Sequence, residues 1–290
     1  MISSSSSCAI LFSGGTDSTC TAAVLAEVFK TVHLITFYDI SNINSPLPIE
    51  NVKRLKKAFP DTTFIHVKIN TDKLIKHLSF SKYFTYLLKY KLISTANCFY
   101  IPLSWHIRTL IYCLEHKITT VADGLTKELL YLPGHMEKFL REVTSLYTQF
   151  EIQHQNTVRE WEIPEEQSIM DRFVVDQHGF LFPSEEKEKK FKKTTGQYLY
   201  KKNILPHPNV KGSVFDKQMQ HDCYPFVLYK ILIFWVYLKI MTYNSLEKII
   251  SLLAHDKILD IIPILDSYQK THTLKSLPFY SKEEVIHYDY

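Results

Sequence analysis

Glycine is scarce in this sequence, with seven residues in 290. Two of the seven, Gly14 and Gly15, are adjacent and lie in the segment AILFSGGTDSTCTAAVLAEVF, residues 9–29. Glycine is used where the backbone needs a positive φ angle or where another group approaches the main chain closely. The pair therefore makes this segment the first candidate for a ligand-binding loop.

Cysteine is also sparse, and its spacing excludes two classes of protein. The five cysteines are Cys8, Cys20, Cys98, Cys113 and Cys223, and no two of them form a Cys-x-x-Cys pair. An odd number without close pairs argues against a disulfide scaffold and against a zinc knuckle. We expect a reducing, cytoplasmic setting, in which Cys8, Cys20 and Cys113 are packing residues.

Long apolar runs and a strong charge are both missing. The formal net charge is only +4. Lysines gather at 186–193, where they form either a solvated helix face or a surface that contacts phosphates. Residues 225–241 are strongly apolar but carry Lys230 and Lys239 in a run of minimal spanning length. We expect a buried helix there, no secretory signal and no membrane partner. The alternative is an apolar face covered by a partner subunit, as in a homodimer formed through the C-terminal helices.

The pattern of apolar residues alternates between strands and helices in the first half of the chain. Strands are predicted at 9–12, 31–39, 62–70 and 118–124, and helices at 18–30, 48–59, 72–92 and, after a loop, within 97–117. Asp17 or Ser18 could cap the first helix. Alternation of this kind predicts an α/β fold with a parallel sheet flanked by helices. It fades after residue 150, which predicts an α/β domain over 1–150 and a smaller, mostly helical domain over 151–290.

Three groups of polar residues follow predicted strands, at 13–18, 38–39 and 123–124, where parallel sheets bind their ligands. In the first group, glycine amides, the hydroxyls of Ser13, Thr16 and Ser18 and a helix N-terminus favour an anion such as a phosphate. The segment lacks the lysine of the Walker phosphate-binding motif, GxxxxGK[ST], and the glycine spacing of the dinucleotide-binding motif, GxGxxG, so both of these loops are excluded. Asp17 would repel a bare phosphate, so it either binds a bridging Mg²⁺ or caps the helix.

The motif SGGTDST at 13–19 resembles the SGGxDS signature of the PP-loop ATP pyrophosphatases. The resemblance implies a Rossmann-like, HUP-type parallel sheet that binds ATP with Mg²⁺ and cleaves it between the α and β phosphates. The substrate oxygen is adenylated and pyrophosphate is released. By position, the resemblance assigns ATP binding to the loop residues Ser13, Gly14, Gly15, Thr16, Asp17 and Ser18, and it makes Asp17 both catalytic and a ligand of the Mg²⁺ bound with ATP. It places Phe37 and Tyr38 at the adenine ring. Asp123 and Gly124, at the end of the fourth predicted strand, complete the ATP site.

A second stretch, STANCFYIPLSWHIRTLIYCLEHKITTVADG, resembles tRNA 2-thiouridylases and sacrificial-sulfur enzymes. Cys98 falls on their first catalytic cysteine, and Cys223 in MQHDCYPF is the candidate for the second. The sequence lacks their following cysteine pair and replaces a Thr-Gly-His turn with Asp123-Gly124-Leu125. The resemblance implies sulfur transfer to a tRNA base with help from a sulfur donor protein. The alternatives are an amide- or amidine-forming synthetase acting on a small molecule and an ATP-binding subunit without catalysis.

Overall fold

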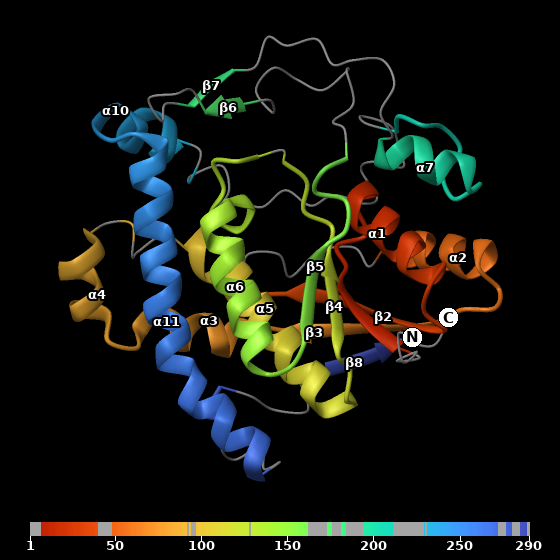
Figure 1. The fold of residues 1–290 in the computed structure, drawn as a ribbon, viewed down its shortest axis with the longest axis horizontal. Coiled ribbons are helices and arrows are strands. Elements are labelled where there is room, and N and C mark those ends of the chain that lie inside the picture. Colours follow the sequence, from red (N-terminus) through yellow and green to blue (C-terminus); the bar gives the residue numbers. More distant parts are fainter. Residues whose placement is uncertain are drawn as a thin grey trace.

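The computed structural model describes residues 7–39, 48–91, 93, 97–127, 129–161, 173–175, 181–183, 194–210, 229, 231–271, 277–279 and 285–288. Its centre is a six-stranded sheet with the order β5-β4-β1-β2-β3-β8 (Figure 1). The strands are β1 (Ser7–Leu11), β2 (Thr31–Tyr38), β3 (Thr63–Asn70), β4 (Thr120–Asp123), β5 (Gln153–Asn156) and β8 (Val285–Tyr288).

The five strands from β5 to β3 are parallel, and β8 pairs antiparallel with β3. β1 lies in the middle, where Ile10 is in register with Leu34 on one side and Ala122 on the other. The central strands are largely apolar because helices cover both of their faces, and their buried polar side chains, His33, Thr36 and His66, are hydrogen-bonded. The predicted α/β, Rossmann-like fold with a parallel sheet, flanking helices and a helical C-terminal region is confirmed.

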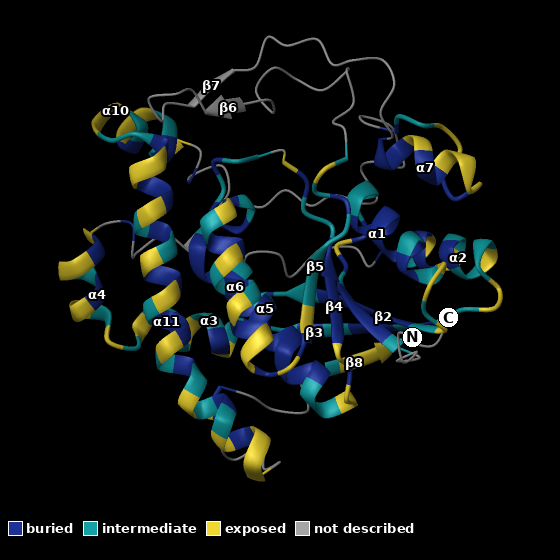
Figure 2. Ribbon diagram, viewed as in Figure 1, coloured by how far each residue is buried: buried dark blue, intermediate teal, exposed yellow. Residues whose placement is uncertain are grey.

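The helices form two layers with separate apolar clusters. One layer consists of α1 (Thr16–Ala26), α2 (Ile49–Ala58) and α7 (Thr195–Lys201), packed on strand residues such as Cys8 and Ile10. The other consists of α3 (Asp72–Phe80), α4 (Tyr83–Tyr90), α5 (Asn97–His116), α6 (Glu137–Gln149) and α11 (Tyr243–Thr271). Figure 2 shows the buried sides of both layers turned toward the sheet.

Several elements differ from the sequence expectation. Residues 72–92 form two helices instead of one, because the chain turns at Lys82, which has φ +54°. The N-cap of α1 is Gly15, so the prediction of Asp17 or Ser18 as the cap is wrong. Strands β5 and β8 were not predicted, and both lie beyond residue 150 within the same sheet as β1. The division into two domains at residue 150 stays a prediction.

The apolar segment after residue 228 is helical where it is described. It contains a π-helical turn, η4 (Ile233–Tyr237), followed by α10 (Leu238–Ile240) and then by α11. Tyr229, Ile233 and Tyr237 are buried, whereas Trp235 and Ile240 are 71 % exposed, so the segment is buried on one side only. Among the helices that the structure describes, none has the length and apolar character needed to cross a membrane.

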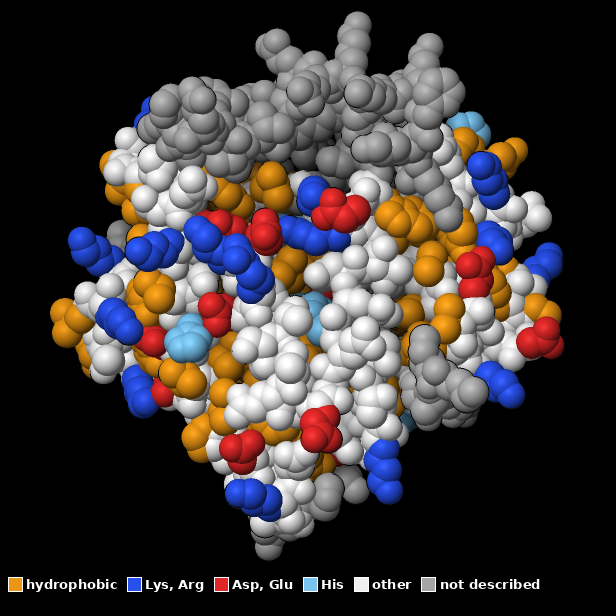
Figure 3. Space-filling view, viewed as in Figure 1, with side chains coloured by type: hydrophobic (Ala, Val, Ile, Leu, Met, Phe, Trp, Pro, Cys, Tyr) orange, Lys and Arg blue, Asp and Glu red, His pale blue; other side chains and the backbone are white. Residues whose placement is uncertain are grey.

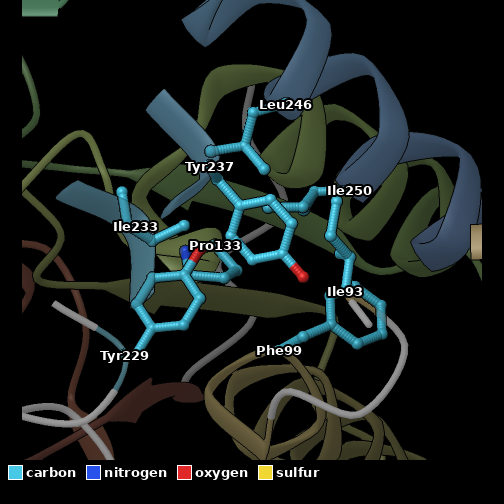
Figure 4. A pocket seen from close by; sticks show the side chains of 8 residues that line it. All are labelled: Ile93, Phe99, Pro133, Tyr229, Ile233, Tyr237, Leu246 and Ile250. Carbon is cyan, nitrogen blue, oxygen red and sulfur yellow. The ribbon is translucent and has the colours of Figure 1, made fainter. Parts of the chain in front are cut away.

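Beneath η4 lies a small apolar cavity with room for about one water molecule. Figure 4 shows its lining, which includes the rings of Tyr229, Tyr237 and Phe99. The hydroxyls of Tyr229 and Tyr237 are buried without a hydrogen-bond partner in the described structure. The cavity is far too small for a nucleotide, so the candidate site has to be sought at the strand ends.

The remaining described elements are the paired strands β6 (Phe173–Val175) and β7 (Leu181–Pro183) and the short helix η2 (Pro133–His135).

Candidate functional site

The loop between β1 and α1 is held in shape by its own hydroxyl groups. The backbone N–H of Gly14 donates to Ser18 Oγ (3.1 Å), which also lies 3.1 Å from Ser13 Oγ and from the carbonyl oxygen of Gly15. Thr19 Oγ1 donates to the carbonyl oxygen of Gly14. Ser18 is buried at the centre of these contacts, whereas Ser13 is exposed. The hydroxyl of Ser18 therefore organises the loop. The hydroxyl of the exposed Ser13 also bonds within it, since it accepts from the backbone N–H of Gly15 (3.3 Å).

Gly14 has a structural reason to be glycine. Its φ of +82° is in the left-handed region, and a Cβ built there would lie 2.0 Å from Cβ of Pro48. The buried Asn51 in α2 reinforces this contact, since its Nδ2 donates to the carbonyl oxygen of Gly14 over 2.7 Å. Both the backbone conformation and the packing of the residues before and within α2 therefore require a residue without a side chain at position 14.

The end of β4 meets the same loop from the other side. A Cβ at Gly124 would lie 2.6 Å from both the N and the Cα atom of Ser18, so the two main chains are in direct contact. Thr21 Oγ1 of α1 also donates to the carbonyl oxygen of Asp123, at 3.4 Å. The structure thus brings residues 13–18 and residues 123–124 together, as expected for two strand ends at one edge of a parallel sheet.

The carboxylate of Asp123 is enclosed by protein hydrogen bonds. Its Oδ2 accepts from His154 Nε2 (2.9 Å) and from Asn156 Nδ2 (2.6 Å), and its Oδ1 accepts from the backbone N–H of Leu125 (3.0 Å). Burial raises the pKa of Asp123, but the hydrogen bonds from His154 and Asn156 and the neighbouring imidazole of His154 outweigh it and hold the pKa below its usual range. Asp123 thus fixes the turn around Gly124, and both of its carboxylate oxygens accept hydrogen bonds from the protein.

The bonds around Asp123 continue into the layer of α5 and α6. Thr144 Oγ1 lies 2.9 Å from Nδ1 of His154, and the ring of Tyr147 stacks on that of His154 with a centroid distance of 5.0 Å. Burial lowers the pKa of the neighbouring His106 to about 3, so His106 is neutral at physiological pH. Through these side chains α6 is connected to the turn that touches the loop.

Asp17 is tied to α7. Thr195 Oγ1 donates to Asp17 Oδ1 over 2.6 Å, and α7 begins beside it with a capping box formed by Thr194 and Gln197. Burial raises the pKa of Asp17, and the bond from Thr195 opposes that rise. Thr195 occupies one carboxylate oxygen, so a metal ion would have to use the other. In the part of the chain that the structure describes, no three His, Cys, Asp or Glu side chains come together as metal ligands.

Phe37 and Tyr38, the predicted adenine contacts, lie on opposite faces of the sheet because they are consecutive in β2. Phe37 packs against Trp105 of α5 in a stacked arrangement with centroids 5.9 Å apart. The ring of Tyr38 lies 4.7 Å from Nζ of Lys68. Both side chains are half-buried. A single adenine ring could therefore stack on the side chain of Phe37 or on that of Tyr38, but not on both.

Of the two cysteines proposed to handle sulfur, only Cys98 lies in the described structure. It carries a half-buried thiol in the first turn of α5, and it packs against the apolar cluster of the α5 layer. Cys223 lies outside the described residues. Cys8, Cys20 and Cys113 are buried within the apolar clusters, which confirms them as packing residues.

Sequence reasoning missed four residues that shape the site: Asn51, His154, Asn156 and Thr195. Each is a polar side chain that the fold carries to a strand end from a distant segment. His154 and Asn156 could have been suspected, because two polar residues spaced by two point to the same face of a strand. For Asn51 and Thr195 the sequence offers no local signal, since their partners Gly14 and Asp17 lie far away in the chain.

The fold and the loop define an α/β protein with a Rossmann-like sheet and a glycine-containing loop between its central strand and the following helix. No family model and no curated protein matches the chain. Among solved structures, one described as a predicted subunit of tRNA methyltransferase from Methanocaldococcus jannaschii is similar over 54 % of this chain and 69 % of its own. The identity is 18 % and the TM-score 0.32, a level of similarity that carries no argument about function.

Proposed function

We propose that the loop at 13–18 binds the phosphates of ATP and that the chain uses ATP to adenylate a substrate oxygen. Gly15 is the observation that carries this proposal. Its φ of −65° suits any residue, and a Cβ built there would meet only Ser13 Oγ, at an ordinary contact distance of 3.4 Å. No strained backbone angle and no clash requires a glycine at this position, which is also the N-cap of α1. A phosphate lying directly against the main chain explains it.

The donors around Gly15 suit an anion of this kind. The first-turn amides of α1 point out of the helix N-terminus, whose dipole favours negative charge. The exposed hydroxyl of Ser13 bonds to Ser18 and Gly15 here and would have to turn toward a phosphate to donate to it. A Mg²⁺ ion bound with ATP would neutralise charge on the departing pyrophosphate. The free oxygen of the Asp17 carboxylate is the group that would hold it.

In the proposed reaction, a substrate oxygen attacks the α-phosphorus of ATP. The bond from that phosphorus to the α–β bridging oxygen breaks, and pyrophosphate leaves with the electron pair. The amides and hydroxyls of the loop stabilise the charge that develops on the leaving group. A nucleophile then attacks the activated carbon and displaces AMP.

We further propose that this nucleophile is sulfur and that the acceptor is a tRNA base. α5 leads into β4 through a short connection, so the 20-residue helix runs back across the sheet and its first turn, with Cys98, lies toward the edge of the loop. Cys98 would carry a persulfide supplied by a donor protein. Its terminal sulfur displaces AMP, and Cys223 then attacks the Cys98 sulfur, which releases the thiolated base and leaves a disulfide for a thiol reductant.

Exchange of radiolabelled pyrophosphate into ATP, measured with unfractionated tRNA present, tests the first step. Asp17→Asn should lower the exchange rate by about 100-fold, the loss typical when a group that stabilises developing charge is removed. Thr195→Val is the matched control: it removes the bond to Asp17 but keeps the carboxylate, and should retain most of the exchange. Equal losses in both variants would show that Asp17 serves only to anchor α7.

The sulfur step has a separate test. Cys98→Ala should retain pyrophosphate exchange and lose thiolation of tRNA. If Cys98→Ala and Cys223→Ala both turn over normally with a nitrogen nucleophile, the amide-forming alternative is correct. If the chain binds ATP but exchanges no pyrophosphate with any acceptor, it is a binding subunit.

A further inference from the structure

The helix α4 has an unusual distribution of side chains. Phe84 and Leu88, four residues apart on one face, are 77 % and 84 % exposed, and Phe80 just before the helix is 71 % exposed. The opposite face carries Tyr86 and Tyr90, which are buried against α11. The most apolar face of α4 therefore points into solvent, where contiguous apolar groups mark an interaction surface.

The attachment of α4 to α11 is polar and specific. The hydroxyls of Tyr86 and Tyr90 donate to the carboxylates of Asp260 and Asp256, and Lys82 and Lys89 form ion pairs with the same two aspartates. Beneath them the buried Lys257 donates to the carbonyl oxygen of Ser81. These bonds hold α4 in one orientation, so the outward direction of its apolar face is built into the fold.

Two exposed lysines, each in an ion pair, flank this face. Residues 72–91 contain five lysines, one aspartate and no arginine. The side chains of Lys82 and Lys89 are 59 % and 54 % exposed, whereas their partners Asp260 and Asp256 are only 18 % and 24 % exposed. The carboxylates thus lie beneath the ammonium groups, and an approaching partner meets the lysines first.

Most of the exposed large hydrophobic side chains lie on α4 or on the helices near it. Among the described residues, twelve large hydrophobic side chains are exposed, and nine of them lie at the end of α3, on α4, on η4 with the residues next to it, or on α11. The nine are Phe80, Phe84, Leu88, Ile231, Trp235, Val236, Ile240, Leu252 and Leu259. Figure 3 shows hydrophobic and basic side chains, with acidic ones between them, along the left of the molecule, where Figure 1 places α4, α10 and α11.

We propose that this surface, centred on the outer face of α4, binds the headgroup region of an anionic phospholipid membrane. Phenylalanine, leucine and tryptophan beside lysines are typical of helices that lie in a membrane interface. Lysine is depleted in protein–protein interfaces, and nucleic-acid surfaces favour aromatic rings and arginine over aliphatic side chains. A second copy of the chain would bring lysines against lysines. We expected no membrane partner from the sequence because no segment spans, but a surface helix does not need to span.

The test is flotation of the full chain with vesicles of phosphatidylcholine, alone or mixed with phosphatidylserine. The chain should float with the mixed vesicles, less with the neutral ones, and less as salt is raised. Phe84→Ser combined with Leu88→Ser should weaken binding by at least about tenfold, because two large side chains no longer enter the interface. Val28→Ser, which alters an equally exposed residue (76 %) after α1, is the matched control and should bind normally.

Three results would overturn the proposal. The first is equal flotation of the double variant and the parent chain, or no flotation of either. The second is a dimer, seen by light scattering, that the double variant dissociates, since a second copy would then cover the surface. The third is binding of a labelled single-stranded RNA that the double variant weakens while vesicles are ignored. Thermal unfolding of the double variant should be unchanged, because both side chains are exposed, and pyrophosphate exchange tests the ATP site separately.

Discussion

Replacing Gly124 by alanine should separate the end of β4 from the loop. The new Cβ would lie 2.6 Å from N and Cα of Ser18, whereas carbon atoms in ordinary contact are about 3.5–4 Å apart. One of the two backbones must therefore move by about 1 Å. The turn cannot yield easily, since Asp123 is fixed by three hydrogen bonds. Overpacking of this kind costs about 1–3 kcal/mol, and we expect the upper part of that range.

Gly134→Ala provides a matched control for this prediction. A Cβ at Gly134 in η2 would lie 2.9 Å from Cβ of Pro102, so that variant is overpacked as well, but against α5 and away from the loop. Urea unfolding should show a loss of stability in both variants. Titration calorimetry should show ATP affinity reduced by about tenfold or more in Gly124→Ala alone. If folded Gly124→Ala binds ATP as tightly as Gly134→Ala does, contact between the turn and the loop does not shape the site.

Three other predictions concern groups outside the loop. Burial lowers the pKa of Lys257 to about 8 from 10.5, so the folded chain binds fewer protons than the unfolded chain between these values. Stability should therefore rise with pH across this window by about 1–3 kcal/mol, and urea titrations of Lys257→Met should lack the rise. His154→Ala should destabilise the fold by about 2–4 kcal/mol, measured by urea unfolding, because the Asp123 carboxylate stays buried after losing a donor. In a chain carrying Cys223→Ser, a thiol reagent should modify Cys98 and spare Cys8, whose burial raises its pKa to about 12; rapid labelling of Cys8 would contradict the buried packing of β1.

The sheet around β1 could be predicted from the sequence because its strands are short apolar runs. The four predicted strands correspond to β1, β2, β3 and β4 within a few residues. β5 was missed because its sequence, Gln-His-Gln-Asn, is polar throughout. Those side chains serve Asp123 and the surface instead of an apolar core, which is a tertiary arrangement that periodicity cannot report.

The candidate loop could be located from the sequence, but the roles of its neighbours could not. The SGGTDST motif identified residues 13–18, and the structure adds that Ser18 organises the loop and that Gly14 fits under Pro48. Asp17 was expected at a metal or as a helix cap, and the structure gives it Thr195 as a partner from 178 positions away. The pairing of Phe37 with Tyr38 at one adenine could have been questioned from the sequence alone, since neighbours in a strand face opposite ways.

The position of β8 has a consequence for how the molecule folds. His66 of β3 is in register with Tyr288 of β8, and their rings stack with centroids 5.6 Å apart, although more than 200 residues separate them in the chain. Closing so long a loop adds little free energy, because the entropic cost grows only with the logarithm of its length. The search for such a distant partner is slow, however. During synthesis β3 is made long before β8, and for that interval it is an open sheet edge to which strands of other chains could pair.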